Sequence, residues 1–347
     1  MTGGNFLYNN WYVAAFSADL GRAPLGRKIC GRSVVLFRDA TGQAAALEDR
    51  CIHRGMPLSH GGECEGDIIR CPYHGLEYDR AGICTKIPGQ DRIPAAARLK
   101  TYPLVEQDAL LWVWPGDPAK ADPQDIIRYP YHTDPAWVWS RGQLHVAAGW
   151  QLLNDNLLDL SHLQYVHRKT IGGHPEEDAR AKLSAQREGN RVSVARWLLD
   201  MDAPPFHRAV CGFKGRIDRW QEIEFMPGVL RFYSGATDAG TGAFEGRREG
   251  GMHLRHFHAI TPETAASTNY FFSQARNFNL ADVDLTENMH KMMVATFEED
   301  RGILEPQQAA LSEDDGRELT NIRTDLGTAH ARRIIAEMLA AEHALRA

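Results

Sequence analysis

The stretch from Cys51 to His74 constrains this chain more than any other part of it. It opens with Cys-Ile-His, closes with Cys-Pro-Tyr-His, and places a glycine soon after each pair, at Gly55 and Gly75. Two thiols and two imidazoles form a set of metal ligands. Matched pairs in glycine-containing loops therefore predict two loop tips that close on one metal centre.

Each half of this stretch supplies one cysteine and one histidine. Zinc fingers usually take both cysteines from one half and both histidines from the other, which makes a structural zinc site the less favoured alternative. The mixed pattern suits a [2Fe–2S] cluster with Cys51 and Cys71 on one iron and His53 and His74 on the other. This is the Rieske arrangement, in which two histidines replace two cysteines and raise the reduction potential.

The length of 347 residues exceeds what one small iron–sulfur module needs, so two domains are expected. Short strands with frequent glycine turns continue as far as Trp114 and predict an all-β antiparallel sandwich. Proline and glycine punctuate residues 115–123. We therefore expect a Rieske domain over residues 1–120, including an apolar N-terminal interface segment, a linker over residues 121–136, and a second domain over residues 137–347.

The second domain mixes strands and helices. Strand-like segments recur between residues 190 and 280, and amphipathic helical patterns cover residues 282–310 and 327–347. A further apolar stretch of helical length covers residues 150–166. Strands flanked by helices predict an α+β domain whose helices pack on one antiparallel sheet.

The composition is that of an ordinary globular protein, with a net charge of −6. Lysine and arginine are dispersed, which argues against nucleic acid or an anionic membrane as a partner. No basic leader opens the chain and no apolar run reaches the ~18 residues of a membrane span, so we expect a cytoplasmic protein. The cysteines outside the ligand pairs are expected to be reduced thiols. They are Cys30, Cys64, Cys84 and Cys211.

A second group of polar residues interrupts the apolar stretch at residues 150–166. Asp159 and His162 lie three apart and share a helix face, whereas His162 and His167 lie five apart. For both imidazoles to reach one ion, the helix must end or bulge between them. Two histidines with one carboxylate form the facial triad of non-haem Fe(II) oxygenases, which leaves positions open for O2. The alternative is a pair of hydrogen-bonded histidines without a metal.

The carboxylate of such a triad must come from elsewhere in the chain. Glu298, Glu299, Asp300 and Glu305 lie in the long C-terminal helical segment, and spacing alone does not choose among them. Asp159 is better placed to accept a hydrogen bond from the ring N–H of the first histidine.

Bulky and basic residues of the strand region are candidates for a substrate pocket. Bulky residues of this kind more often belong to the hydrophobic core than to a pocket. Charged residues are mostly exposed, so we expect each basic residue at the surface or in a cross-strand pair rather than bound to a substrate carboxylate. The glycine-containing segment at residues 240–246 lacks the spacing of a dinucleotide-binding loop. The bulky candidates are Trp220, Met226, Tyr233, Phe257, Phe271 and Phe272, and the basic candidates are Arg219, Arg231, His253 and Arg255.

Short motifs accompany the two metal sites along the whole chain. They are Asn10-Trp-Tyr12, Cys51-x-His53-Arg-Gly-x-Pro-Leu-Ser59, Cys71-Pro-Tyr-His-Gly75, Asn156-x-x-Asp159-x-x-His162-x-x-x-x-His167, Thr261-Pro-Glu263, and Glu299-Asp300 followed by Glu305. With these motifs the chain resembles the oxygenase component of Rieske non-haem iron oxygenases, and most closely the vanillate O-demethylase and dicamba monooxygenase branch. The resemblance implies a helix-grip catalytic domain with a central cavity, and head-to-tail homotrimers in which each cluster feeds the iron of the next subunit.

The resemblance also implies a role for each matching residue. Asp159 would bridge a ligand histidine of the mononuclear iron to a Rieske histidine of the neighbouring subunit, and Asn156 would lie near the open iron face. One [2Fe–2S] cluster per subunit would be held by Cys51, His53, Cys71 and His74, and one mononuclear Fe(II) by His162, His167 and Asp300.

The reaction implied is oxidation of an aromatic acid by O2, with electrons from a separate NAD(P)H-dependent reductase. The leading expectation is O-demethylation of a methoxybenzoate such as vanillate to a phenol and formaldehyde. Hydroxylation or cis-dihydroxylation of another aromatic compound by the same metal sites is the alternative. A Rieske electron carrier without catalysis is a remote one, because some two hundred further residues carry a second metal site.

Overall fold

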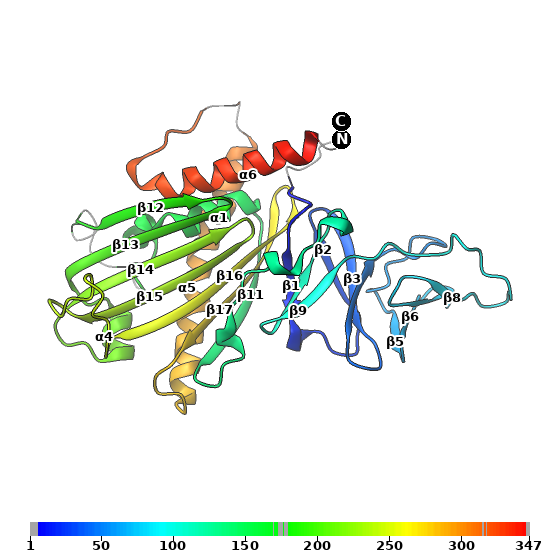
Figure 1. The fold of residues 1–347 in the computed structure, drawn as a ribbon, viewed down its shortest axis with the longest axis horizontal. Coiled ribbons are helices and arrows are strands. Elements are labelled where there is room, and N and C mark those ends of the chain that lie inside the picture. The colour runs from blue at the N-terminus through cyan, green and yellow to red at the C-terminus, as the bar shows by residue number, and fades with distance from the viewer. Residues whose placement is uncertain are drawn as a thin grey trace. The chain divides into compact units, whose positions relative to one another are not determined.

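In a computed structural model of the chain, residues 6–168, 170–172, 176, 180–313, 316 and 318–344 are described. The chain forms two compact units (Figure 1). The first runs to Arg128 and also takes in Thr261–Ala265, and the second comprises Tyr129–Ile260 and Ala266–His343. The change of unit after Arg128 falls within residues 121–136, the segment expected to be a linker.

The first unit is built from antiparallel strands, as the sequence predicted. They form three small sheets in the orders β1-β10-β9, β2-β3-β4 and β5-β6-β7-β8. The strands are β1 (Tyr12–Phe16), β2 (Leu25–Ile29), β3 (Arg32–Arg38), β4 (Ala44–Glu48), β5 (Glu63–Glu65), β6 (Ile68–Arg70), β7 (Glu77–Asp79), β8 (Cys84–Lys86), β9 (Leu104–Gln107) and β10 (Leu110–Val113), with short 3-10 turns at Ser17–Asp19, Pro118–Lys120 and Pro123–Asp125.

Strand β3 separates two hydrophobic cores of this unit. Val34 and Leu36 pack in one core, and Val35 and Phe37 pack in the other. Successive side chains of a strand point to opposite faces, so a strand covered on both faces is apolar at every position. The N-terminal segment expected at an interface forms β1, and its Tyr12 packs in the first of these cores.

The second unit is built on one antiparallel sheet of seven strands, in the order β11-β17-β16-β15-β14-β13-β12. The pairing register decides which side chains share a face: Ile223 lies opposite Phe232, and Phe232 lies opposite His256. The strands are β11 (Val138–Val146), β12 (Lys182–Glu188), β13 (Arg191–Asp202), β14 (Arg216–Met226), β15 (Val229–Asp238), β16 (Met252–Thr264) and β17 (Ser267–Arg276).

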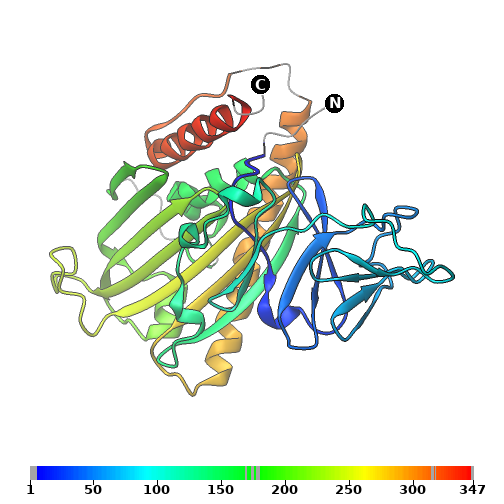
Figure 2. The same ribbon diagram turned by 45° about the vertical axis from the view of Figure 1, so that its right-hand side comes forward.

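Helices pack against this sheet, which gives the α+β architecture expected from the sequence (Figures 1 and 2). Helix α5 (Val283–Ser312) crosses one face, and α6 (Leu326–Ala344) lies by β12, where Arg187 pairs with Glu337. Among the described helices, none is long and apolar enough to cross a membrane. The buried residues of α5 recur every three or four positions and so form one helix face; they are Met289, Met293, Thr296, Asp300 and Leu304. Further short elements of the second unit include α4 (Pro205–Cys211) and 3-10 turns at Pro130–His132 and Arg323–Asp325.

The apolar stretch at residues 150–166 is not one helix. Helix α1 (Trp150–Leu158) ends before Asp159, whose backbone is extended. A 3-10 turn, η5 (Leu160–His162), and the short helix α2 (Leu163–Val166) follow. Helix α2 ends between His162 and His167, as their five-residue spacing predicted. The earlier break at Asp159 was not predicted.

Candidate metal centres and substrate cavity

Two loops of the first unit have the same backbone hydrogen bonds. In the first loop, the N–H of Cys51 donates to the carbonyl of Met56 and the N–H of Gly55 donates to the carbonyl of Cys51, both at 2.9 Å. The corresponding bonds of the second loop start at Cys71 and Gly75 and measure 2.8 and 3.1 Å. The φ angles of Gly55 and Gly75 are 73° and 68°, in the left-handed region that favours glycine. The glycines after each pair therefore serve to form two copies of one turn.

The side chains of these loops converge in the way a Rieske cluster requires. Cys51 and Cys71 are buried, whereas His53 and His74 are exposed and their Nδ1 atoms lie 3.1 Å apart. Burial raises the pKa of the Cys71 thiol, so a thiolate at this place needs a cation beside it. Two buried thiols and two converging ring nitrogens on a pair of equivalent turns therefore fit a [2Fe–2S] group.

Tyr78 is a neighbour of this site that the sequence did not reveal. Its hydroxyl lies 3.1 Å from the sulfur of Cys51, and the side chain is fully buried on β7. Hydrogen bonds to cluster sulfurs are one of the factors that set the potential of an iron–sulfur centre. No sequence signal separates this tyrosine from the others in the chain.

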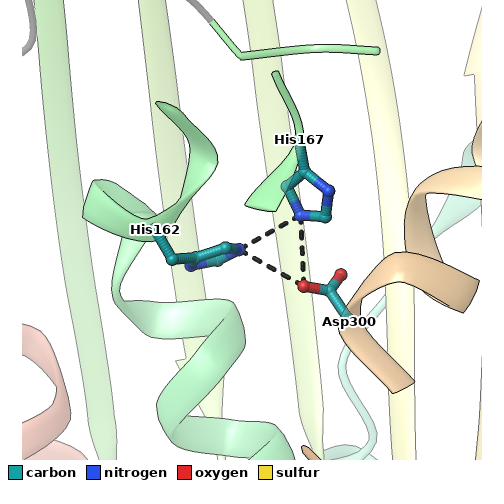
Figure 3. Close-up of side chains that lie close together, drawn as sticks. All are labelled: His162, His167 and Asp300. Carbon is teal, nitrogen blue, oxygen red and sulfur yellow. Dashed lines mark hydrogen bonds and ion pairs between the residues drawn. The ribbon is translucent and has the colours of Figure 1, made fainter. Parts of the chain in front are cut away.

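Three side chains of the second unit meet at one point (Figure 3). The Nε2 atoms of His162 and His167 lie 3.2 Å apart, and Oδ1 of Asp300 lies 3.4 Å from the first and 3.1 Å from the second. All three ligand atoms lie within 4.8 Å of one another. The histidines come from the end of η5 and the residue after α2, and the aspartate comes from α5. Two imidazoles and one carboxylate at this separation form a facial-triad ligand set for Fe(II).

Oxygen acceptors hold the outer nitrogens of both histidines. Nδ1 of His162 lies 2.6 Å from the backbone carbonyl oxygen of Asp159, and Nδ1 of His167 lies 2.7 Å from Oε2 of Glu299. The hydroxyl of Thr170 donates to the same Glu299 oxygen at 3.1 Å. These acceptors place the ring proton on Nδ1, so each Nε2 keeps a lone pair for the metal.

Burial separates Asp300 from the other acids of α5. Asp300 is 4% exposed, whereas Glu298 forms an ion pair with Arg301 and Glu305 accepts a hydrogen bond from the N–H of Ala147. Burial alone would raise the pKa of Asp300, but hydrogen bonds and charge from the two histidines outweigh it and lower the pKa to about 2. The carboxylate is therefore ionised at neutral pH, as a metal ligand must be.

Asp159 and Asn156 both lie beside the triad. The contact of Asp159 with His162 is made by its backbone carbonyl rather than by its carboxylate, which instead accepts hydrogen bonds from the N–H and the hydroxyl of Ser161 at 2.8 and 3.0 Å. Nδ2 of Asn156 donates to Oδ1 of Asp300 at 3.1 Å. Asn156 therefore orients the Asp300 carboxylate, and its own Oδ1 is buried without a partner among the described residues.

The triad lies in the wall of a cavity of about 100 Å³ within the second unit. Most of the wall is apolar, contributed by β14 to β16, α5 and the segment from α1 to α2. Asp300 is the one acid among the described lining residues, and the basic residues besides the two triad histidines are Arg219, His207, His256 and His258. A cavity of ~150 Å³ can hold benzene, so the space in this structure is on the scale of one ring at most and is too small for a fused ring system.

The six bulky residues considered as pocket candidates do not line this cavity, which agrees with the expectation that such residues more often belong to the core. Alternation along a strand explains their position, because neighbouring residues line the cavity instead. On β14, for example, Arg219 and Ile223 face the cavity, so the indole of Trp220 lies on the other face. Phe272 shares the cavity face but packs behind Phe297, with ring centroids 4.6 Å apart. The six are Trp220, Met226, Tyr233, Phe257, Phe271 and Phe272.

The four basic candidates have different surroundings. Arg231 forms an ion pair with Glu224, His253 contacts a backbone carbonyl at 3.1 Å, and Arg255 packs over three aromatic rings. Arg219 is only 5% exposed and lines the cavity. The expectation of a surface or cross-strand position is therefore wrong for Arg219.

Both metal centres fall within known protein families. Residues 10–103 match the Rieske [2Fe-2S] domain, and residues 146–341 match the vanillate O-demethylase oxygenase C-terminal domain. The chain belongs to the family of Rieske non-haem iron oxygenase components. It is an oxidoreductase with a Rieske [2Fe–2S] cluster and a mononuclear non-haem iron.

Relatives of known activity match nearly the full length of the chain. It is 40% identical to the iron–sulfur subunit of a toluene-4-sulfonate monooxygenase system of Comamonas testosteroni, over 97% of this chain and 98% of that protein. It is 38% identical to a vanillate O-demethylase oxygenase subunit of Pseudomonas sp. strain HR199, over 97% and 96%. A crystal structure of dicamba monooxygenase bound to 3,6-dichlorosalicylic acid matches with a TM-score of 0.92 and 32% identity, covering 98% of this chain and 99% of that one. Another structure of that enzyme, with non-haem iron and dicamba, matches with a TM-score of 0.85.

Proposed function

We propose that the chain is the terminal oxygenase of a multicomponent monooxygenase that acts on a single-ring aromatic acid. The reaction we propose is O-demethylation of a methoxybenzoate such as vanillate. The observation that carries this proposal is the position of the triad, His162, His167 and Asp300, in the wall of a small and mostly apolar cavity. The relatives named for vanillate and dicamba support the choice of an aromatic methyl ether.

Iron held by the triad supplies the activation of O2 that C–H oxidation requires. One oxygen atom enters a C–H bond of the methyl group, and the other leaves as water with two electrons and two protons. The hydroxylated methyl ether is a hemiacetal, which breaks down to a phenol and formaldehyde. The protein holds Asp300 ionised and places the Nδ1 atom of each triad histidine against an oxygen acceptor, and its apolar wall orients the ring and excludes water.

The electrons are proposed to come from a separate NAD(P)H-dependent reductase. The segment at residues 240–246 lies in the connection between β15 and β16, not at the start of a helix, so it does not have the context of a dinucleotide-binding loop.

Product analysis tests this function. The chain, loaded with its metals, is mixed with a reductase, NADH and methoxy- and methyl-substituted aromatic acids under air, and formaldehyde and aromatic products are measured together. Formaldehyde in a one-to-one ratio with a new phenol supports O-demethylation. Consumption of NADH and substrate to a ring cis-diol contradicts the proposal.

A second candidate function is hydroxylation of a methyl group attached to the ring of an arenesulfonate. The 40% and 41% identities to subunits named for toluene-4-sulfonate monooxygenase favour it. A hydroxylated aryl methyl group is a stable benzylic alcohol, so the same assay separates the two functions by the absence of formaldehyde.

We also propose a head-to-tail homotrimer in which Asp159 links His162 to a Rieske histidine of the neighbouring subunit. The carboxylate of Asp159 supports this role because it lies next to a ligand histidine and retains lone pairs beyond its bonds to Ser161. In an Asp159→Asn variant, the reductase should still reduce the cluster at the normal rate. Transfer of the electron from the cluster to the iron should be at least about tenfold slower in a single turnover. A monomer by light scattering, or an unchanged rate in the variant, contradicts this proposal.

A further inference from the structure

One arginine of the cavity has no acidic partner among the described residues. Arg219, on β14, is 5% exposed, and its Nη1 donates to the carbonyl of Ile171 at 3.1 Å. Its Nε is buried without a hydrogen-bond partner. Burial, with a further contribution from the positive charge of Arg196, lowers the pKa of Arg219 to about 9. A buried guanidinium without an anion is costly, which points to an anion that joins it.

His207 presents a second unused polar atom to the same cavity. It lies on α4, is 3% exposed, and has no partner for Nδ1 among the described residues. Burial, and then the charge of Arg219, holds the pKa of His207 well below its usual range, so the ring is neutral and lies near the guanidinium. The other two buried histidines of the cavity outside the triad are already engaged. Nε2 of His256 lies 3.1 Å from the hydroxyl of Ser234, and Nδ1 of His258 lies 2.7 Å from the hydroxyl of Tyr270.

The guanidinium of Arg219 binds the backbone turn that follows His167 of the triad. Its partner Ile171 precedes Gly172, whose N–H donates to the carbonyl of the ligand His167 at 2.9 Å. One backbone turn therefore separates the cation from the triad. The apolar residues Ile223 and Phe232 line the same cavity beside it.

We propose that Arg219, assisted by His207, binds the oxyanion of an aromatic acid substrate, a carboxylate or a sulfonate. A guanidinium can offer Nε and an Nη to two oxygens in parallel, and Nε is the atom that the folded chain leaves unpaired. The bound ring then lies against the apolar wall with its oxidisable substituent toward His162 and Asp300. This inference rests on the proposed function, because it names the group by which that site recognises its substrate.

Equilibrium binding tests the assignment without turnover. Calorimetry on the metal-loaded chain compares two anions, 4-methoxybenzoate and 4-methylbenzenesulfonate, with their neutral analogues, 4-methoxybenzamide and 4-methylbenzenesulfonamide. Arg219→Gln is expected to weaken binding of the anion about ten- to a hundredfold and to leave the neutral analogue unchanged. Whichever anion shows the larger loss is the class of acid that the site takes. Arg231→Gln is the matched control, since Arg231 lies on the next strand, pairs with Glu224 and does not line the cavity.

Thermal unfolding distinguishes a binding role from a structural one. An arginine that serves only to hold the carbonyl of Ile171 would give a variant that melts at lower temperature and still prefers anions, and this result overturns the proposal. The proposal expects Arg219→Gln to melt no lower than the parent without ligand, and to lose the stabilisation that the anion gives the parent. Arg219→Lys keeps the charge without the parallel pair of donors and should bind the anion with intermediate affinity.

Turnover separates failure of this inference from failure of the proposed function. Binding of anions that depends on Arg219, without formaldehyde from any methoxy substrate, refutes O-demethylation and leaves the anion site standing. Formaldehyde production by Arg219→Gln with the KM of the parent refutes the anion site and leaves the function standing.

Discussion

The hydrogen bond between His167 and Glu299 predicts a graded loss of iron from the catalytic site. Oε2 of Glu299 accepts from Nδ1 of His167 at 2.7 Å, and the hydroxyl of Thr170 holds the same oxygen at 3.1 Å. Glu299→Gln keeps the length of the side chain and one oxygen acceptor but removes the negative charge. Glu299→Ala removes the acceptor and frees the imidazole to rotate.

The expected magnitudes follow from the strengths of these bonds. A charge-assisted hydrogen bond is about twice as strong as a neutral one, so Glu299→Gln should cost about 1.4 kcal/mol, or about tenfold in iron affinity. Loss of an outer partner of a metal-bound histidine costs up to about a hundredfold, which is the expectation for Glu299→Ala. The carboxylate of Asp300 stays in place in both variants because its own bonds are to other residues.

The assay is competition for Fe(II) with a chelator of known affinity, under anaerobic conditions. The visible spectrum of the Rieske cluster serves as the internal control, since its ligands lie in the other unit and should be unaffected. Glu298→Gln is the matched variant, because this adjacent acid pairs with Arg301 and does not contact the triad. If Glu299→Ala binds iron within twofold of the parent, the orienting role of Glu299 is refuted.

Three further predictions follow from the structure. Burial lowers the pKa of His167, but Asp300 and Glu299 outweigh burial and raise this pKa above its usual value. A proton then competes with iron for the ring, so the affinity for Fe(II) should fall up to about tenfold per pH unit between pH 8 and pH 6. An iron affinity that does not change with pH contradicts this prediction. Tyr78→Phe removes a hydrogen bond to the sulfur of Cys51 and should lower the reduction potential of the cluster by about 40 mV in a redox titration. This value takes ~1 kcal/mol for the hydrogen bond and ~59 mV for each tenfold change in a one-electron equilibrium. An equal or higher potential contradicts the prediction. Gly235→Ala would place a methyl group against the Trp220 ring and the Met252 carbonyl and should lower the free energy of unfolding by about 1–3 kcal/mol, whereas Gly21→Ala, with open space around it, should stay within about 0.5 kcal/mol.

The first metal site could be predicted from the sequence because its geometry is local. Each ligand pair lies within one short turn, and Gly55 and Gly75 fix those turns without help from the rest of the fold. The end of the helix between His162 and His167 could be predicted for a similar reason, since their spacing requires such a break if both rings are to meet. Asp300 could not be chosen from its neighbours, because only the packing of α5 on the sheet decides which acid is buried.

The cavity could not be predicted, because its walls depend on the register of strands that are far apart in the sequence. Residue type does not tell which of two adjacent positions faces the cavity, so Trp220 was considered and Ile223 was not. Arg219 was assigned to the surface by the general behaviour of charged residues, and the structure contradicts this assignment because Arg219 is buried in the cavity wall.

Helix α5 is a single rod of 30 residues that carries Asp300 together with the cavity residues Met289, Met293 and Phe297 on successive turns. A substitution that tilts or shifts this rod moves the iron ligand along with the cavity wall. The opposite wall is different, because the strands that contribute residues such as Leu230 carry no iron ligand. Substitutions on the strands can therefore change which substrate fits the cavity without moving Asp300. Evolution or engineering of new specificity is most readily achieved at these strand positions.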